Sequence, residues 1–238
     1  MGVRNCCRIA LLLVFGLGSN LTGAEEIDKH SSAIRIADYV MTTEGASWQY
    51  ENIAGVGESP IVMGIGSEIE FNGHTVDRRD ENNGDYRYQT IDDNGVRVYQ
   101  LYFKGDYLVT YPRPAQIFPA WVKPGDKLYD RVPYTFKKID GEVIETGVQH
   151  YDMEVLRKEV VQVPTGNYPD VIAIRTKAER VADTGERKGY DLIEWFARGV
   201  GAVKVQGEIY WVDKEDNKKT MPIDAALEKT NMPMNGLK

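Results

Sequence analysis

The sequence is poor in cysteine and histidine. Its two cysteines, Cys6 and Cys7, both fall within the first 24 of the 238 residues. The rest of the chain therefore has no cysteine nucleophile and no disulfide. The three histidines, His30, His74 and His150, are too far apart in sequence to form a ligand pair on one helix or strand, whereas a closed zinc site needs four ligands. We predict neither a metal site nor a cofactor.

Other signatures of catalysis are missing as well. No serine beyond residue 24 stands in the Gly-x-Ser-x-Gly turn that presents a nucleophile. The acidic run 77–85 lacks the residue order of a calcium loop. Asp191 and Glu194 lie three positions apart in a predicted strand, so their side chains leave opposite faces and cannot act as a carboxylate pair. We therefore expect a protein that is not an enzyme.

Long apolar runs are absent, with one short exception near the start of the chain. The run Ile9–Leu17 has about half of the ~20 residues that a membrane-spanning helix needs, so we predict no transmembrane segment. Arg4 and Arg8 precede this run, and small residues at Thr22 and Ala24 follow it. This layout is typical of a cleavable secretion signal. We predict a signal peptide over residues 1–24 and a single β-rich domain over residues 25–238.

The predicted signal has consequences for location and charge. A bacterial lipid-attachment site would place a cysteine directly after the apolar run, whereas Cys6 and Cys7 precede it, so we expect no lipid anchor. Cleavage after Ala24 removes two of the 29 basic residues and none of the 36 acidic ones, which leaves a formal net charge of −9. This excess disfavours nucleic acid and anionic membrane surfaces as partners. A cysteine-free exported domain is typical of a bacterial envelope, so we expect a periplasmic or extracellular protein.

Alternation dominates the sequence from Ile34 onward. β-Branched and aromatic residues recur at every second position and are interrupted by Gly, Asn and Asp, which predicts antiparallel strands joined by tight hairpins. The fold class that we expect is mainly β: a strongly curved antiparallel sheet or half-barrel built of hairpins and a meander, with few short helices. The predicted strands are 47–53, 85–91, 96–103, 107–111, 134–139, 142–145, 149–163, 171–182, 190–196 and 200–213.

Two segments depart from this pattern. Four prolines between Tyr111 and Asp126 each remove a backbone donor, which predicts a long surface crossing there. The only helices that the sequence favours are a short one near Ile223–Lys229 and one just after the signal.

Three segments resemble parts of secreted bacterial β-domains of unknown function. They are Gly45-Ala46-Ser47-Trp48-Gln49-Tyr50, Val163-Pro164-Thr165-Gly166-Asn167-Tyr168 and the stretch from Glu194 to Lys204, which contains Gly199-Val200-Gly201. Such domains are similar to the periplasmic lipoprotein-carrier type of fold, in which a curved antiparallel sheet wraps a hydrophobic cavity. The resemblance implies a fold and an envelope location, but no activity and no catalytic residue.

The aromatic content suggests where a ligand could bind. The chain has fourteen tyrosines and four tryptophans, which line cavities and partner surfaces well but also fill ordinary β cores. We name Trp48, Tyr50 and Trp195 as ligand-cavity candidates. Our first hypothesis is a non-enzymatic exported module that binds a lipid or other apolar ligand, or a segment of an envelope protein. The alternative is a structural or assembly protein of the cell envelope, and an envelope hydrolase ranks third.

Overall fold

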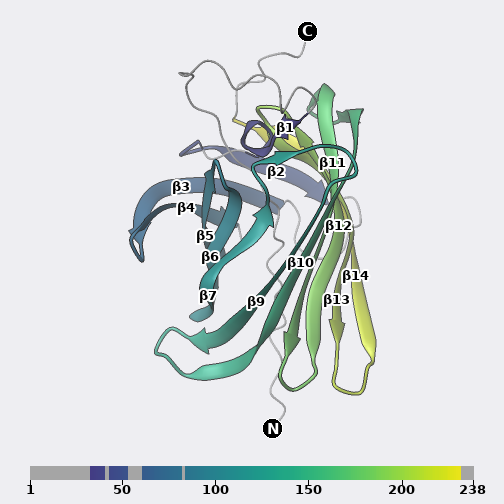
Figure 1. Cartoon of the computed structure of the whole chain (residues 1–238). Helices are drawn as coiled ribbons and strands as arrows, with labels where there is room; N and C mark the ends of the chain where they lie inside the picture. The colour runs from purple at the N-terminus through teal and green to yellow at the C-terminus, as the bar shows by residue number, and fades with distance from the viewer. Residues whose placement is uncertain (1–32, 41–42, 53–60, 82–83, 232–238) are drawn as a thin grey trace.

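A computed structural model describes residues 33–40, 43–52, 61–81 and 84–231 of the chain (Figure 1). The predicted signal peptide lies outside these residues, so it and the domain boundary after residue 24 stay predictions. The elements are β1 (Ile34–Arg35), the 3₁₀ helix η1 (Ile36–Asp38), β2 (Ser47–Asn52), β3 (Ile61–Phe71), β4 (His74–Glu81), β5 (Tyr86–Asp92), β6 (Gly95–Phe103), β7 (Tyr107–Phe118), β8 (Trp121–Val122), β9 (Lys127–Lys138), β10 (Val143–Val163), β11 (Gly166–Ala182), β12 (Arg187–Ala197), β13 (Gly201–Val212) and β14 (Lys218–Thr230).

Twelve of these strands form one closed antiparallel barrel. Their order around it is β10-β11-β12-β13-β14-β2-β3-β4-β5-β6-β7-β9, while β1 and β8 pair separately. The expectation of a mainly β fold is confirmed, but the expected open curved sheet or half-barrel is wrong. The sheet closes because β14 pairs with β2, from Ala225 opposite Asn52 to Thr230 opposite Trp48. Pairing supplies partners for strand edges that an open sheet would leave free.

Strand β7 occupies part of the predicted surface crossing after Tyr111, so that prediction was wrong over this stretch. The strand runs through Pro112 and Pro114, which cannot donate to a ladder. Its register with β6 shifts between Val98 and Gln100, and both prolines lie in the excursion that results. The sheet therefore tolerates them at a place where the ladder is already interrupted.

Strand β14 replaces the helix that was predicted near Ile223–Lys229. Ile223, Ala225 and Leu227 are buried at every second position, as the inward face of a strand requires. Strands β13 and β2 flank β14 and satisfy its backbone groups. The helical tendency of the Ala225-Ala226-Leu227 stretch is overridden by this pairing.

The seam between β7 and β9 is only partly laddered. The two strands pair from Tyr107–Lys138 to Thr110–Thr135. Farther along, the Asp130 carboxylate accepts two hydrogen bonds from the Arg113 guanidinium, at 2.5 and 3.0 Å, and one from the Gln116 backbone N–H at 2.8 Å. Burial alone would raise the pKa of Asp130, but these hydrogen bonds outweigh it and lower that pKa. The side chain of Asp130 thus joins the two strands where their backbones separate.

Helix η1 covers one end of the barrel (Figure 1). Ile36 and Val40 are fully buried in the same hydrophobic core as the barrel strands. The Asp38 carbonyl accepts a hydrogen bond from Gly199 N–H at 2.8 Å, and its carboxylate pairs with Arg198 at 2.6 Å. These contacts fix the segment before β2 to the turn between β12 and β13.

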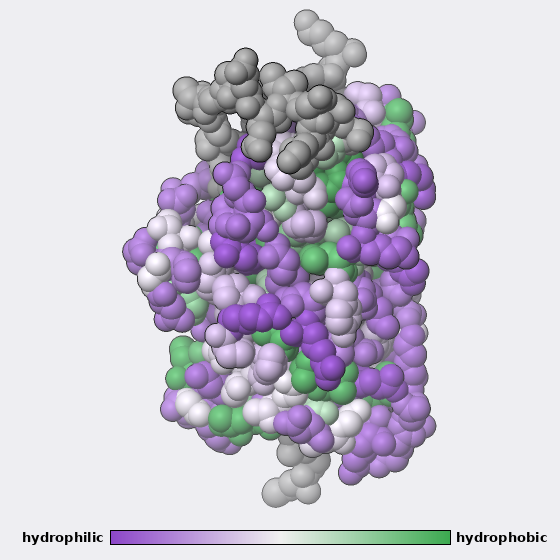
Figure 2. Space-filling view, viewed as in Figure 1, coloured by the Kyte–Doolittle hydropathy of each residue, from purple (hydrophilic) through white to green (hydrophobic). Residues whose placement is uncertain are grey.

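The outer surface is mostly hydrophilic on the face shown in Figure 2, with separate apolar areas. Within the described ranges, no helix is long and apolar enough to cross a membrane. The same residues contain no group of three or more His, Cys, Asp or Glu side chains arranged to hold a metal ion.

Candidate functional site

Trp48 and Tyr50 lie buried on the inward face of β2. The Trp48 indole N–H donates to the Val200 carbonyl at 2.7 Å, and the Tyr50 hydroxyl donates to the Ala202 carbonyl at 2.9 Å. Two of the three segments that carry the sequence resemblance are therefore joined by hydrogen bonds. Burial raises the pKa of Tyr50 well above its ordinary value, with Arg79 opposing this effect and Glu194 adding to it.

Trp195 lies on the other face of its strand. Successive residues of a strand point to opposite faces, so Trp195 leaves the face opposite to Glu194, yet at 7% exposure it is still buried in the same hydrophobic cluster as Trp48 and Tyr50. Its indole N–H donates to the Glu159 carboxylate at 2.7 Å, and the Lys204 ammonium lies 5.1 Å from the ring centroid. The structure thus places Trp48 and Tyr50 on one face of β2, whereas the polar contacts of Trp195 are with Glu159 and Lys204. Whether any of the three contacts a ligand stays a prediction.

The barrel interior also contains charged side chains. Arg79 on β4 and Arg87 on β5 are directly opposite each other, and both are at least 98% buried. The Arg79 guanidinium lies 5.9 Å from the Trp48 ring centroid, and Arg87 Nε donates to Gln89 Oε1 at 2.7 Å. Glu194 is fully buried as well. A ligand inside this part of the barrel would meet charge, which an apolar molecule cannot solvate.

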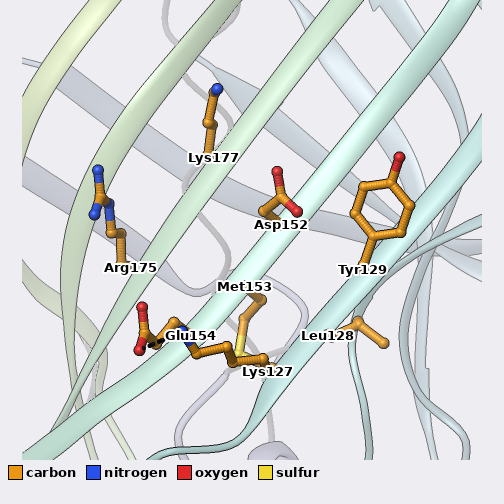
Figure 3. Close-up of a pocket in the computed structure, with 8 residues that line it drawn as sticks. All are labelled: Lys127, Leu128, Tyr129, Asp152, Met153, Glu154, Arg175 and Lys177. Carbon is orange, nitrogen blue, oxygen red and sulfur yellow. Dashed lines mark ion pairs between the residues drawn. The ribbon is translucent and has the colours of Figure 1, made fainter.

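A pocket of about 370 Å³ lies over strands β9, β10 and β11 (Figure 3). Strand register explains its composition. Tyr129, Asp152 and Lys177 occupy directly paired positions on the three strands, and Lys127, Glu154 and Arg175 form the next such row. The row between them contains the buried Met153, which faces the core, so the two rows of polar residues face outward. The pocket is lined by Lys127, Leu128, Tyr129, Asp152, Met153, Glu154, Arg175 and Lys177.

The charges at the edge of the pocket are paired with each other. Lys127 pairs with Glu154 at 3.0 Å. Arg175 forms two hydrogen bonds to the Asp191 carboxylate, at 2.8 and 2.6 Å, and these raise the pKa of the guanidinium. The basic side chain of each pair is more than half exposed and the acidic one is partly exposed, so these pairs orient the side chains more than they stabilise the fold.

The centre of the pocket is different. Lys177 and Asp152 form no ion pair with any residue in the described ranges, and in Figure 3 they point the same way as Tyr129. The Tyr129 ring is 57% exposed, and its hydroxyl lies 3.0 Å from His150 Nδ1, which fixes the ring on the surface. An aromatic ring, an ammonium and a carboxylate are thus presented side by side from rigid strands.

Sequence reasoning did not find this pocket. Apart from the buried Met153, its residues are ordinary surface or partly exposed residues of three strands, and they match no motif. Only the pairing of residues 127–129 with 152–154, and of these with 175–177, brings them together. The one signal in the sequence that could have indicated the pocket is Tyr129, an aromatic residue in a stretch where charged residues alternate with others.

No protein-family model matches the chain, and no curated protein does. Two solved structures show limited similarity. One is a candidate lipoprotein from Parabacteroides distasonis, with a TM-score of 0.41 and 15% identity, covering 80% of this chain and 96% of its own. The other is a candidate exported protein with a YmcC-like fold from Bacteroides fragilis, with a TM-score of 0.44 and 12% identity, covering 80% of this chain and 97% of its own. At these values, neither likeness carries an inference about this chain.

Proposed function

We propose that the chain is an exported, non-catalytic binding module of the bacterial envelope, and that its pocket over β9, β10 and β11 binds a segment of a partner protein. The export part of the proposal rests on the signal pattern around Ile9–Leu17. The binding part rests on one observation: the exposed Tyr129 ring lies beside Lys177 and Asp152, which have no ion-pair partner among the described residues.

A partner segment fits this chemistry better than an apolar ligand does. The pocket presents three charged side chains besides Lys177 and Asp152, and an apolar ligand would have to desolvate them. The interior face near Trp48 and Tyr50 carries Arg79 and Glu194. Neither place offers the uniformly apolar lining that a lipid carrier needs.

The pocket also defines what the segment should contain. An acidic side chain would complement Lys177, and a basic or amide group would complement Asp152. An apolar side chain between them would pack on the Tyr129 ring. Because all three residues belong to paired strands, little conformational entropy is lost on binding.

The structural alternative receives less support from the topology. Assembly through strand edges needs unpaired edges, and the barrel order closes on itself through β14 and β2. We therefore place the binding surface on the outward faces of the strands.

The proposal is tested by selecting peptides from a random library on the exported protein and measuring the affinity of a selected peptide by fluorescence anisotropy. We expect Lys177→Glu and Tyr129→Ala each to weaken binding at least about tenfold, which corresponds to about 1.4 kcal/mol. Lys219→Glu, an exposed lysine on β14, serves as the matched control and should leave the affinity unchanged. Peptides that bind all variants equally would refute the pocket as the binding site.

A second measurement separates the partner segment from the apolar ligand. Native mass spectrometry of protein purified from its own envelope should show the mass of the polypeptide alone. A retained lipid would contradict the proposal and favour a carrier.

A further inference from the structure

The turn between β9 and β10 has an exposed apolar surface. Ile139 is 61% exposed, Val143 57% and Ile144 46%, and these three make up half of the strongly exposed large hydrophobic residues among those described. We call residues 139–144 the β9–β10 tip. Single exposed aliphatic residues are common, but a group of three within six positions points to an interaction site.

The β9–β10 tip extends beyond the barrel wall. The register of β10 with β9 shifts between Val143 and Glu145, which leaves Ile144 without a paired residue on β9. Both Val143 and Ile144 are about half exposed, so neither side chain is buried in the barrel core. Figure 1 shows this hairpin projecting at the lower left of the molecule, and Figure 2 shows apolar surface in the same region.

The turn has a defined conformation. Ile139 N–H donates to the Asp106 carbonyl in the neighbouring β6–β7 turn at 2.8 Å. Lys138 N–H donates to the Glu142 carbonyl at 2.9 Å, and the side chains of the same two residues form an ion pair. The apolar side chains are therefore held in place without packing against one another in the core.

The local charge is balanced although the chain as a whole is acidic. Lys104, Lys137 and Lys138 are matched by three acidic residues in the two adjoining turns, Asp106, Asp140 and Glu142, whereas the chain carries a formal net charge of −7. Neighbouring turns at this end carry more acidic than basic residues: Asp183 and Glu186 lie between β11 and β12, and Asp213, Glu215 and Asp216 lie with Lys214 between β13 and β14. A zwitterionic lipid surface, which carries no net charge, would not repel this end of the barrel. An anionic lipid surface would repel the acidic turns around the β9–β10 tip.

We propose that the β9–β10 tip inserts into the headgroup and upper acyl region of a zwitterionic lipid bilayer. A narrow tip that exposes three aliphatic side chains fits a deformable bilayer. The lysine side chains beside it can extend their apolar stems along the inserted residues and keep their ammonium groups at the lipid phosphates. This interaction is independent of the pocket and needs no transmembrane segment.

The test is co-sedimentation of the exported protein with phosphatidylcholine vesicles. We expect the triple variant Ile139→Ser, Val143→Ser, Ile144→Ser to partition at least fivefold less than the wild type. Val160→Ser is the matched control, because Val160 is 60% exposed on the same strand but outside the tip, and it should partition like the wild type. Far-ultraviolet circular dichroism checks that the variants are folded. Equal partitioning of wild type and triple variant would overturn the proposal, as would a wild type that does not partition.

A position-specific readout confirms where contact occurs. In a background with Cys6→Ser and Cys7→Ser, an environment-sensitive fluorophore on V143C should shift to the blue when phosphatidylcholine vesicles are added, and the same fluorophore on V160C should not. Adding phosphatidylglycerol to the vesicles should reduce the shift, because the surrounding turns are acidic. A shift at neither position, or an equal shift at both, would rule out insertion through the tip.

Discussion

Tyr50 shows how a single hydroxyl group connects distant segments. Its O–H donates to Ala202 at the start of β13, in a fully buried setting. Tyr50→Phe keeps the ring but leaves the Ala202 carbonyl without this donor, so we expect a loss of about 1–3 kcal/mol in the free energy of unfolding. Urea denaturation measures it as a shift of the midpoint at constant m-value. Tyr129→Phe, which changes an exposed hydroxyl, should be close to neutral, and equal losses in the two variants would contradict the role of burial.

Asp77 gives the protein a pH-dependent stability. It is nearly buried on β4, opposite Glu68 on β3 and Gln89 on β5. Burial, and then the charge of Glu68, raise the pKa of Asp77 from 3.8 to about 7. The folded state therefore holds a proton that the unfolded state releases, so the stabilisation is complete below pH 4 and is lost as the pH rises toward 7.

We expect the free energy of unfolding to fall between pH 4 and pH 7 through this group, by at most about 4 kcal/mol. Asp77→Asn should remove the slope and be more stable than the wild type at pH 8. Glu68→Gln should reduce the slope, because one of the two causes is gone. Urea denaturation across this pH range measures all three proteins, and parallel curves for wild type and Asp77→Asn would show that Asp77 does not titrate there.

The inward face of β2 could be predicted at the residue scale, but the pocket could not. Alternation places Trp48 and Tyr50 on one face of a strand, and the structure shows that face buried. The same rule also separates Trp195 from Glu194. Alternation gives no information on which strands are neighbours, so it could not bring Tyr129, Asp152 and Lys177 together.

Among the elements, hairpins with glycine-containing turns were the most predictable. Asp140-Gly141 and Arg198-Gly199 stand in turns as expected, and Gly199 has a positive φ of 70°. The errors in β7 and β14 have a common cause. Proline and alanine content describes the local preference of a segment, whereas pairing with two flanking strands decides its conformation.

Gly207 in β13 is required for a different reason from Gly199. Its φ is 148°, and a Cβ atom there would lie 2.1 Å from the Asp191 carbonyl oxygen of β12, whereas a Cβ atom on Gly199 would meet no atom within 4 Å. Gly199→Ala should therefore cost only the backbone strain of a turn, about 1 kcal/mol, while Gly207→Ala should cost more because two paired strands must move apart.

Thermal unfolding of both variants, with Gly64→Ala as the control, measures this difference. Gly64 has no positive φ, and a Cβ atom there would make an ordinary contact at 3.5 Å. A Gly207→Ala variant that melts no lower than Gly199→Ala would show that β12 and β13 are not in close contact at this point.

At the scale of the whole molecule, closure is the feature that the sequence could not reveal. The hairpins follow from local turns, but the pairing of β14 with β2 joins strands from opposite ends of the described chain. Such a contact has no local signature, because either strand would show the same alternation in an open sheet. The number of strands is likewise compatible with an open sheet and with a closed barrel. Closure therefore has to be tested by a covalent link across the seam.

A disulfide between β2 and β14 provides that test. Gln49 and Lys229 are paired positions on the two strands, so cysteines introduced there should be close enough to bond. In a Cys6→Ser, Cys7→Ser background, we expect Q49C with K229C to lose both free thiols on mild oxidation, and peptide mapping under non-reducing conditions should show the two strands linked. The control pair, Q49C with K219C, uses a position at the far end of β14 that pairs with Trp211 of β13, and its thiols should stay free. The linked protein should also melt at a higher temperature, because the bond closes a long loop and restricts the unfolded chain. An open curved sheet would hold β2 and β14 at separate edges, and in that case the first pair would remain reduced like the control.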